Sequence, residues 1–236
     1  MFDFQGKVAV ITGASGISIG KTIAKHFFEA GAKVAVCSHN EERIMLAAKE
    51  IGETDPERMF AMEADTSDIE SIRRFAGAVL EHYGKIDIWV NNAGIHFPKP
   101  SLEVTPEDWN NTVDVNLRGY FFGAQAAAGY MIENGGGSII NIGSVNKTIV
   151  TVGETVYATT KAGISKMTEN LAREWGPSGI RVNCIAPGSI PTLMNQKQYS
   201  DIKVHQAMCD KLPLRRRGEA DEIADGVLFM ASPYAS

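Results

Sequence analysis

The chain has 236 residues, of which 44% are hydrophobic and 22% charged, a balance that suits a globular protein with a real core. The net charge of −5, and basic runs no longer than Arg215-Arg216-Arg217, argue against a nucleic-acid partner. No apolar stretch approaches the roughly 20 residues that span a bilayer, and the N-terminal residues lack the layout of a signal peptide, so we expect a cytoplasmic protein with no membrane partner.

Short β-branched runs alternate along the chain with longer stretches of helical pattern. Strands are expected at residues 7–12, 33–38, 59–64, 86–91, 138–142 and 181–186. Helices are expected at residues 20–30, 40–51, 68–83, from 105 onward, at 155–175 and at 221–230. This alternation predicts an α/β fold of the Rossmann type, a doubly wound parallel sheet with helices on both faces. We expect a single domain over residues 1–236, with an irregular substrate lid at about 190–212.

Two of the helix starts carry capping signals. Ser67 and Glu70 have the spacing of a capping box at the start of the third helix. Thr105 and Pro106 open a long helix, with proline in the first turn where its missing N–H costs nothing.

The first predicted strand leads directly into a glycine-rich segment, residues 12–20, and then into a helix. Glycines at such a turn let the backbone approach a pyrophosphate, whose charge is favoured at the helix N-terminus. Turns also use glycine for purely conformational reasons, but the position between a strand and a helix favours a dinucleotide site. The cofactor-binding residues expected here are Gly13, Ser15, Ser18, Ile19 and Gly20.

The end of the second strand predicts which dinucleotide binds. An acidic side chain there holds the ribose 2′-hydroxyl of NAD, whereas a 2′-phosphate favours the absence of an acid and a nearby cation. The residues at this place are Ser38, His39 and Asn40. The sequence therefore favours NADP(H), with Ser38 and His39 contacting the phosphate, while the lack of an arginine keeps NAD(H) open.

Tyr157 and Lys161 are four residues apart on a predicted helix, so both project from one face. A free tyrosine has a pKa of about 10, too high for a base at neutral pH, and a neighbouring ammonium lowers that pKa. Such a pair can give a proton to a carbonyl oxygen, or take one from an alcohol, while a hydride moves.

A second pair with the same spacing, Tyr199 and Lys203, shows that spacing alone decides nothing. The surroundings distinguish the two pairs. Ser144 stands thirteen residues before Tyr157, just past the fifth strand, where its hydroxyl could bind the reacting oxygen. The matching residue before Tyr199 is Ala186, which has no such group.

These residues, with others in the same order, resemble the short-chain dehydrogenase/reductase family along essentially the whole chain. The resemblance is carried by Thr12-Gly13, Asp65, Asn91-Asn92-Ala93-Gly94, Asn116, Ser144, Tyr157 with Lys161, Arg181-Val182-Asn183, Pro187-Gly188 and Thr192. It implies an NAD(P)-dependent oxidoreductase that interconverts an alcohol and a ketone or aldehyde. It also implies a homo-oligomer, a dimer or a tetramer.

The resemblance implies four catalytic roles. Tyr157 would be the general acid/base, and Ser144 would orient the substrate oxygen. Lys161 would bind the nicotinamide ribose and tune Tyr157, and Asn116 would hold a water that extends the proton relay. Asn116 could instead be a residue at a helix bend, and Asn92, Ala93 and Gly94 could mainly stabilise the sheet.

The resemblance implies binding residues as well. Asp65 would meet the adenine, Asn91 the adjacent ribose, and Ile190 with Thr192 the carboxamide. Further cofactor contacts are implied at Thr66, Ala93, Gly94, Tyr157, Lys161, Pro187 and Gly188. The substrate is expected over Ser144, near His96, Val145, Asn146, Glu154 and Met194. The scattered histidines and the three cysteines lack ligand spacing, so we expect no metal site.

The sequence departs from the family pattern in two places. The glycine-rich segment is one residue longer than usual, and Ser18 stands where a glycine is usual. Its Ser18-Ile19-Gly20 ending resembles the enoyl-thioester reductase branch, but that branch has its lysine seven residues after the tyrosine, where this chain has Ile164. Similar chains also continue beyond Ser236 into a seventh strand, so either the sheet is one strand short or a tail is missing.

Three functions follow from these observations. The first is an alcohol/carbonyl oxidoreductase acting on a polyol, a 3-oxoacyl thioester or a steroid. The second is an enoyl-thioester reductase, suggested by the Ser18 loop. The third is a non-catalytic NAD(P)-binding sensor, suggested by the altered loop, although a sensor has no need of the proton relay that Ser144, Tyr157 and Lys161 would form.

Overall fold

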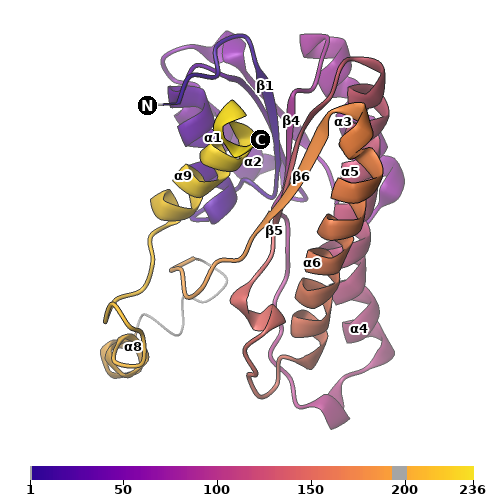
Figure 1. Cartoon of the computed structure of the whole chain (residues 1–236). Helices are drawn as coiled ribbons and strands as arrows, with labels where there is room; N and C mark the ends of the chain where they lie inside the picture. The colour runs from indigo at the N-terminus through magenta and orange to yellow at the C-terminus, as the bar shows by residue number, and fades with distance from the viewer. Residues whose placement is uncertain (1, 193–200) are drawn as a thin grey trace.

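The computed structural model describes residues 2–192 and 201–236 (Figure 1). Its centre is a parallel six-stranded sheet in the order β3-β2-β1-β4-β5-β6. The strands are β1 (Val8–Thr12), β2 (Lys33–Ser38), β3 (Met59–Glu63), β4 (Ile88–Asn91), β5 (Gly137–Ile142) and β6 (Ile180–Ile185). The chain leaves β1 toward β3 on one side and then restarts at β4 on the other. This confirms the predicted doubly wound Rossmann-type sheet.

Helices cover both faces of the sheet, as Figure 1 shows. One layer holds α1 (Ile19–Glu29), α2 (Glu41–Ile51) and α9 (Ala220–Ala231). The other holds α3 (Ile69–Tyr83), α5 (Gly119–Glu133) and α6 (Thr155–Trp175), with α4 (Pro106–Val113) before α5. In β1, Ala9 and Ile11 pack on the first layer while Val8 and Val10 pack on the second, so the strand is buried on both sides.

The helix after Thr105 differs from the predicted long helix. It begins as expected, because Thr105 and Asp108 form a capping box around Pro106. However, the segment Asp114–Arg118 is π-helical, and only then does α5 begin. In this segment the N–H of Gly119 donates to the carbonyl of Asp114, five residues back, which gives the helix a local bulge.

The capping box predicted at Ser67 and Glu70 is wrong. The residue that caps α3 is Asp68, whose side chain accepts from the N–H of Glu70 at 3.0 Å. The side chain of Ser67 is directed to Asp65, to which its hydroxyl donates at 2.8 Å.

Polar side chains at the centre of the sheet form a buried hydrogen-bond network. Trp89 Nε1 donates to Asn91 Oδ1 at 2.7 Å, and Asn91 Nδ2 donates to Asn141 Oδ1 at 2.9 Å. Asn141 Nδ2 in turn donates to the hydroxyl of Thr168 at 2.9 Å. These bonds join β4, β5 and α6 beneath the carboxyl ends of the strands, and each buried polar group gains a partner.

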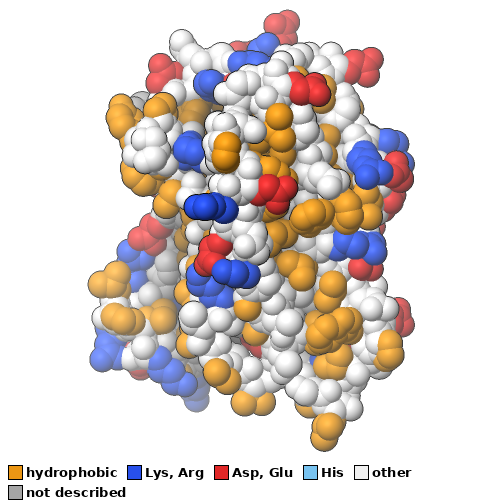
Figure 2. Space-filling model, turned by 45° about the vertical axis from the view of Figure 1, so that its right-hand side comes forward, with side chains coloured by type: hydrophobic (Ala, Val, Ile, Leu, Met, Phe, Trp, Pro, Cys, Tyr) orange, Lys and Arg blue, Asp and Glu red, His pale blue; other side chains and the backbone are white. Residues whose placement is uncertain are grey.

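The surface formed by α4, α5 and α6 carries apolar side chains among charged ones (Figure 2). Its exposed large residues include Trp109, Phe121 and Ile132. Between α5 and α6 lies a shallow groove of about 230 Å³ that includes Phe121, Ile132 and Trp175. No described helix is both long and apolar enough to cross a membrane.

Candidate functional site

A cavity of about 690 Å³ opens at the carboxyl ends of the strands. In doubly wound sheets this edge is where ligands bind. The predicted site residues that line it are Gly13, Ser15, Ser18, Ile19, Ser38, His39, Asp65, Thr66, Ala93, Gly94, Ser144, Tyr157, Lys161, Pro187, Gly188, Ile190 and Thr192. The fold thus brings together residues drawn from nearly every strand end.

The glycine-rich loop is built for close backbone packing. Gly13 has φ +68°, and a Cβ there would come within 2.6 Å of the Cα of Ala93, so only glycine fits. Gly20 does not line the cavity; a Cβ on it would collide with the side chain of Asn92. Asn92 Nδ2 holds the loop through bonds to the carbonyls of Thr12 at 2.9 Å and Gly13 at 3.0 Å.

Ser18, the residue that replaces the usual glycine, caps α1. Its hydroxyl accepts from the N–H of Lys21 at 3.2 Å. The first turn of α1 contains no acidic residue, and Ser18 and Ile19 both face the cavity. A helix N-terminus in this setting fits a pyrophosphate, because its unpaired N–H groups and its dipole favour negative charge.

Two serines meet at the end of β2. Ser15 Oγ and Ser38 Oγ are 3.0 Å apart, and Ser38 also accepts from the N–H of Asn40 at 3.3 Å. His39, beside them, is exposed and lines the same end of the cavity. This corner offers hydroxyl and imidazole groups and no carboxylate from β2, so its donor set fits a phosphate.

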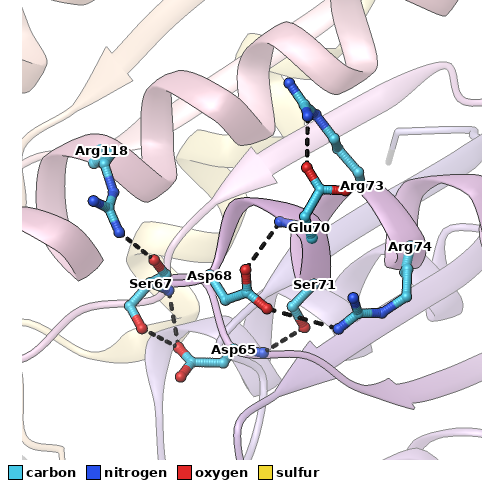
Figure 3. Close-up of polar contacts among 8 residues, drawn as sticks. All are labelled: Asp65, Ser67, Asp68, Glu70, Ser71, Arg73, Arg74 and Arg118. Carbon is cyan, nitrogen blue, oxygen red and sulfur yellow. Dashed lines mark hydrogen bonds and ion pairs between the residues drawn. The ribbon is translucent and has the colours of Figure 1, made fainter.

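The loop after β3 is fastened to the π-helical segment (Figure 3). Asp65 Oδ1 accepts from the N–H of Ser67 at 2.9 Å and from its hydroxyl at 2.8 Å. Arg118 Nη2 donates to the carbonyl of Ser67 at 2.7 Å, while Nη1 lies 3.1 Å from Asp114. Both bonds to Asp65 fall on Oδ1, so Oδ2 remains available to a ligand in the cavity.

Ser144 and Tyr157 form the polar centre of the site. Ser144 is buried just past β5, and it lines the cavity together with Tyr157 on α6. Burial raises the pKa of Tyr157, the polar side chain of Ser144 lowers it, and the carboxylate of Glu154 raises it again. The net direction is upward.

Lys161 lies one helical turn from Tyr157 and is buried. Its Nζ donates to the carbonyl of Ile142 at 2.8 Å and to the hydroxyl of Tyr120 at 3.5 Å. Burial lowers the pKa of Lys161 to about 8. We expected this ammonium to lower the pKa of Tyr157, but burial is the largest influence and the pKa is raised. Nζ is directed to the Ile142 carbonyl and the Tyr120 hydroxyl.

The side chain of Asn116 binds backbone instead of facing the cavity. Its Oδ1 accepts from the N–H of Ile95 and its Nδ2 donates to the carbonyl of Ile95, both at 2.8 Å. Asn116 is fully buried in the π-helical segment. Asn116 thus joins the π-helical segment to the loop after β4.

Asn91 also lies away from the cavity. Its amide is occupied by Trp89, Asn141 and the carbonyl of Tyr120, to which Nδ2 donates at 3.0 Å. Its neighbour Asn92 lines the cavity instead. The resemblance assigned the ribose contact to Asn91 and a role in the sheet to Asn92, whereas in the structure Asn92 is the one that faces the cavity.

Three of the residues expected to meet the substrate, His96, Asn146 and Glu154, contact one another. His96 Nε2 is 3.0 Å from Glu154 Oε1, and Asn146 Nδ2 donates to Glu154 Oε2. His96, Asn146, Glu154 and Val145 are absent from the cavity lining, while Ile95 and Phe97 on either side of His96 contribute to it. Met194 lies outside the described residues.

Several lining residues were not anticipated. They are Ile17, Ser67, Ile95, Asn111, Asp114, Val115, Ile142 and Gly143. Most flank a residue that was predicted, and Asn111, Asp114 and Val115 belong to the helix containing Asn116. Among the described residues no group of three or more His, Cys, Asp or Glu could hold a metal ion.

Comparison with known proteins places the chain among nucleotide-dependent oxidoreductases. A family model described as enoyl-(acyl carrier protein) reductase matches residues 13–236. Glucose 1-dehydrogenase 2 of Bacillus subtilis is 36% identical over 236 residues, 99% of this chain and 91% of the relative. D-threitol dehydrogenase of Mycolicibacterium smegmatis is 37% identical over 238 residues, 100% of this chain and 90% of the relative.

Solved structures agree with these relatives. A gluconate 5-dehydrogenase from Burkholderia cenocepacia, in complex with NADP and tartrate, superposes with a TM-score of 0.91 at 34% identity, covering 99% of this chain and 91% of that one. A short-chain type dehydrogenase/reductase from Mycobacterium marinum gives a TM-score of 0.91 at 34% identity, with the same coverage of 99% and 91%.

Proposed function

Because the chain belongs to the short-chain dehydrogenase/reductase family and is an NAD(P)-dependent oxidoreductase acting on alcohols and carbonyls, we propose that Ser144, Tyr157 and Lys161 perform its proton transfer. The observation that carries this proposal is that these three side chains line the same cavity as the glycine-rich loop. A nicotinamide cofactor supplies or accepts the hydride when bound.

Each of the three residues has a distinct task. The hydroxyl of Tyr157 gives a proton to the carbonyl oxygen in reduction and takes it back in oxidation. Ser144 donates to the same oxygen and orients it between the two hydroxyls. Lys161 holds its positive charge next to Tyr157, where it favours the phenolate when the phenol gives up its proton.

The cofactor we propose is NADP(H). The support is the hydroxyl pair of Ser15 and Ser38 at the end of β2, with exposed His39 beside it and no carboxylate from the strand. We place the pyrophosphate at the N-terminus of α1 and the adenine at Asp65. Fluorescence titration with NADPH and with NADH tests this proposal, and tighter binding of NADH would contradict it.

The substrate class we propose is a small polyol or aldose. Relatives named for glucose and D-threitol support it, and the polar groups of His96, Asn146 and Glu154 next to Tyr157 suit a hydroxylated molecule. With Val145 and residue Met194 of the lid at about 190–212, they would surround the substrate. An enoyl-thioester reductase is not favoured, because Lys161 lies in the cavity while residue Ile164 is fully buried in the protein interior.

The chain would act as a cytoplasmic homo-oligomer. The face of α4, α5 and α6, with its exposed Trp109, Phe121 and Ile132, supports contact with a second copy. Light scattering of the purified chain, compared with Ile132→Lys, tests this assignment. A monomeric wild-type chain would contradict it.

A substrate panel tests the proposed reaction. Oxidation of polyols and aldoses with NADP⁺ should fall roughly 10²- to 10⁴-fold in Tyr157→Phe, while binding of NADPH stays close to that of the unmodified chain. Tyr130→Phe is the matched control, since it removes a phenol hydroxyl bound to the carbonyl of Gly84 at the surface. Reduction of a crotonyl thioester that survives Tyr157→Phe would contradict the proposal and favour an enoyl reductase.

A further inference from the structure

Tyr120 is a buried phenol for which the proposed proton transfer has no task. It lies in the first turn of α5, directly after the π-helical segment, and only 1% of its surface is exposed. Its hydroxyl donates to the carbonyl of Ile142 at 3.1 Å. The same carbonyl accepts from Lys161 Nζ at 2.8 Å, and Nζ also donates to the Tyr120 hydroxyl at 3.5 Å. The two side chains therefore share one acceptor and touch each other.

The ammonium of Lys161 also lies between two phenol rings. Nζ is 5.1 Å from the ring centre of Tyr120 and 5.6 Å from that of Tyr157. Both distances are within the range of cation–π attraction. The position of Nζ is thus determined jointly by β5, α5 and α6.

Core packing alone does not account for this hydroxyl. A phenylalanine would fill nearly the same volume, whereas a buried hydroxyl costs free energy unless it finds a partner. Here the hydroxyl donates to the Ile142 carbonyl and accepts from the buried Lys161. Burial raises the pKa of Tyr120 well above its ordinary value, so the phenol stays neutral and acts as a hydrogen-bond partner.

We propose that Tyr120 is a positioning residue for Lys161. An ammonium has three N–H donors. The Ile142 carbonyl takes one and the Tyr120 hydroxyl takes another, which leaves the third for the cavity, where the nicotinamide ribose would lie. The inference rests on the proposed role of Lys161, and it adds a residue from α5 to the groups on which that role depends.

The groups that face Lys161 determine the pH at which its ammonium loses a proton. Burial disfavours the ammonium, and the acceptors Ile142 and Tyr120 counteract this. The other titratable groups around Nζ are Tyr157 on α6 and Cys184 on β6. Removing the Tyr120 hydroxyl takes away one acceptor and leaves the remaining groups in place, so the lysine should lose its proton at a lower pH.

The test is the pH profile of Tyr120→Phe in polyol oxidation. Activity falls on the alkaline side as Lys161 loses its proton, and that limb of kcat/KM should move to lower pH by about half a unit to one unit. We also expect kcat to fall several-fold. Tyr130→Phe, on the same helix, should leave the alkaline limb where it is. An unmoved limb in Tyr120→Phe would overturn the inference.

Two further variants keep the outcome decisive. Incorporation of 3-fluorotyrosine at position 120 keeps the ring and hydroxyl but weakens the oxygen as an acceptor, so a smaller shift in the same direction is expected even if Tyr120→Phe does not fold.

Lys161→Ala should be nearly inactive. If it retained full activity, the proposed proton transfer would fail and this inference with it; an inactive Lys161→Ala beside an unshifted Tyr120→Phe would overturn the role of Tyr120 alone.

Discussion

The ring of His96 stands edge-on to the ring of Tyr157, with centroids 4.7 Å apart and planes at 65°. Behind His96, its Nε2 lies 3.0 Å from the carboxylate of Glu154, and both side chains are 12% exposed. The proposed acid/base is therefore flanked by a nearly buried negative charge. That charge disfavours the phenolate and contributes to the raised pKa of Tyr157.

Glu154→Gln should therefore lower the pKa of Tyr157. Alcohol oxidation needs the phenolate, so its rate rises as pH passes the pKa of Tyr157, and this acidic limb should move to lower pH in the variant. The measurement is kcat against pH in the oxidative direction. Glu50→Gln, which removes a surface carboxylate paired with Lys21, is the control. A limb that stays in place, or moves upward, would contradict the electrostatic role of Glu154.

Ser38→Asp should shift the cofactor preference toward NAD(H). A carboxylate at the end of β2 accepts from a ribose 2′-hydroxyl and repels a 2′-phosphate, and we expect the ratio of kcat/KM for NADPH over NADH to fall about tenfold or more. Ser38→Asn, similar in size but uncharged, should change the ratio far less. Equal effects of the two variants would mean that charge at this position does not decide the preference.

Gly13→Ala should weaken cofactor binding and lower the free energy of unfolding by more than about 1 kcal/mol. The new Cβ would meet the backbone of Ala93, so the loop must move away from the position that faces the cavity. Gly6→Ala is a matched control, since Gly6 has a similar φ of +71° and nothing within 4 Å of an added Cβ. Chemical denaturation and NADPH titration of both variants distinguish the effect of the clash from that of backbone strain. Equal losses of unfolding free energy and of NADPH affinity in the two variants would contradict this explanation.

Asn91→Ala should destabilise the chain by roughly 3 kcal/mol or more, because it leaves buried groups of Trp89, Asn141 and Tyr120 without their partner. Urea denaturation measures this loss. Since Asn91 does not line the cavity, the dissociation constant for NADPH should change little at a temperature where the variant is folded. Asn134→Ala, at the exposed end of α5, is the control. A large loss of affinity without a loss of stability would restore the contact with ribose that the sequence suggested.

The sequence predicted the parts of the molecule that depend on local patterns. The strands could be predicted from apolar runs alone, and all of them begin and end within two residues of the predicted positions. The placement of Tyr157 and Lys161 on one face could be predicted from the repeat of one helix, and that of Ser144 from the end of a strand. The predicted helix at Thr105 began as expected for the same reason, since its capping box is local.

Other features depend on contacts that no local pattern records. Apolar spacing does not distinguish a short π-helical segment from an α-helix, so the pattern predicted one continuous helix and offered a bend at Asn116 only as an alternative. Asn91 and Asn92 are adjacent, and only the packed helix α5 determines that Asn91 turns inward. The pairing of His96 with Glu154 joins two loops far apart in the chain. The sequence around the start of α3 offered both Ser67 and Asp68 as caps, and in the structure Asp68 caps the helix while Ser67 donates to Asp65.

The layer that holds α1 and α9 has a consequence for biosynthesis. Helix α1, with its buried Phe27 and Ile23, shares a core with α9 through Val227 and Leu228. A nascent chain therefore carries an uncovered apolar surface on α1 until α9 has been synthesised. Chains interrupted before α9 should be targets for chaperones and proteases.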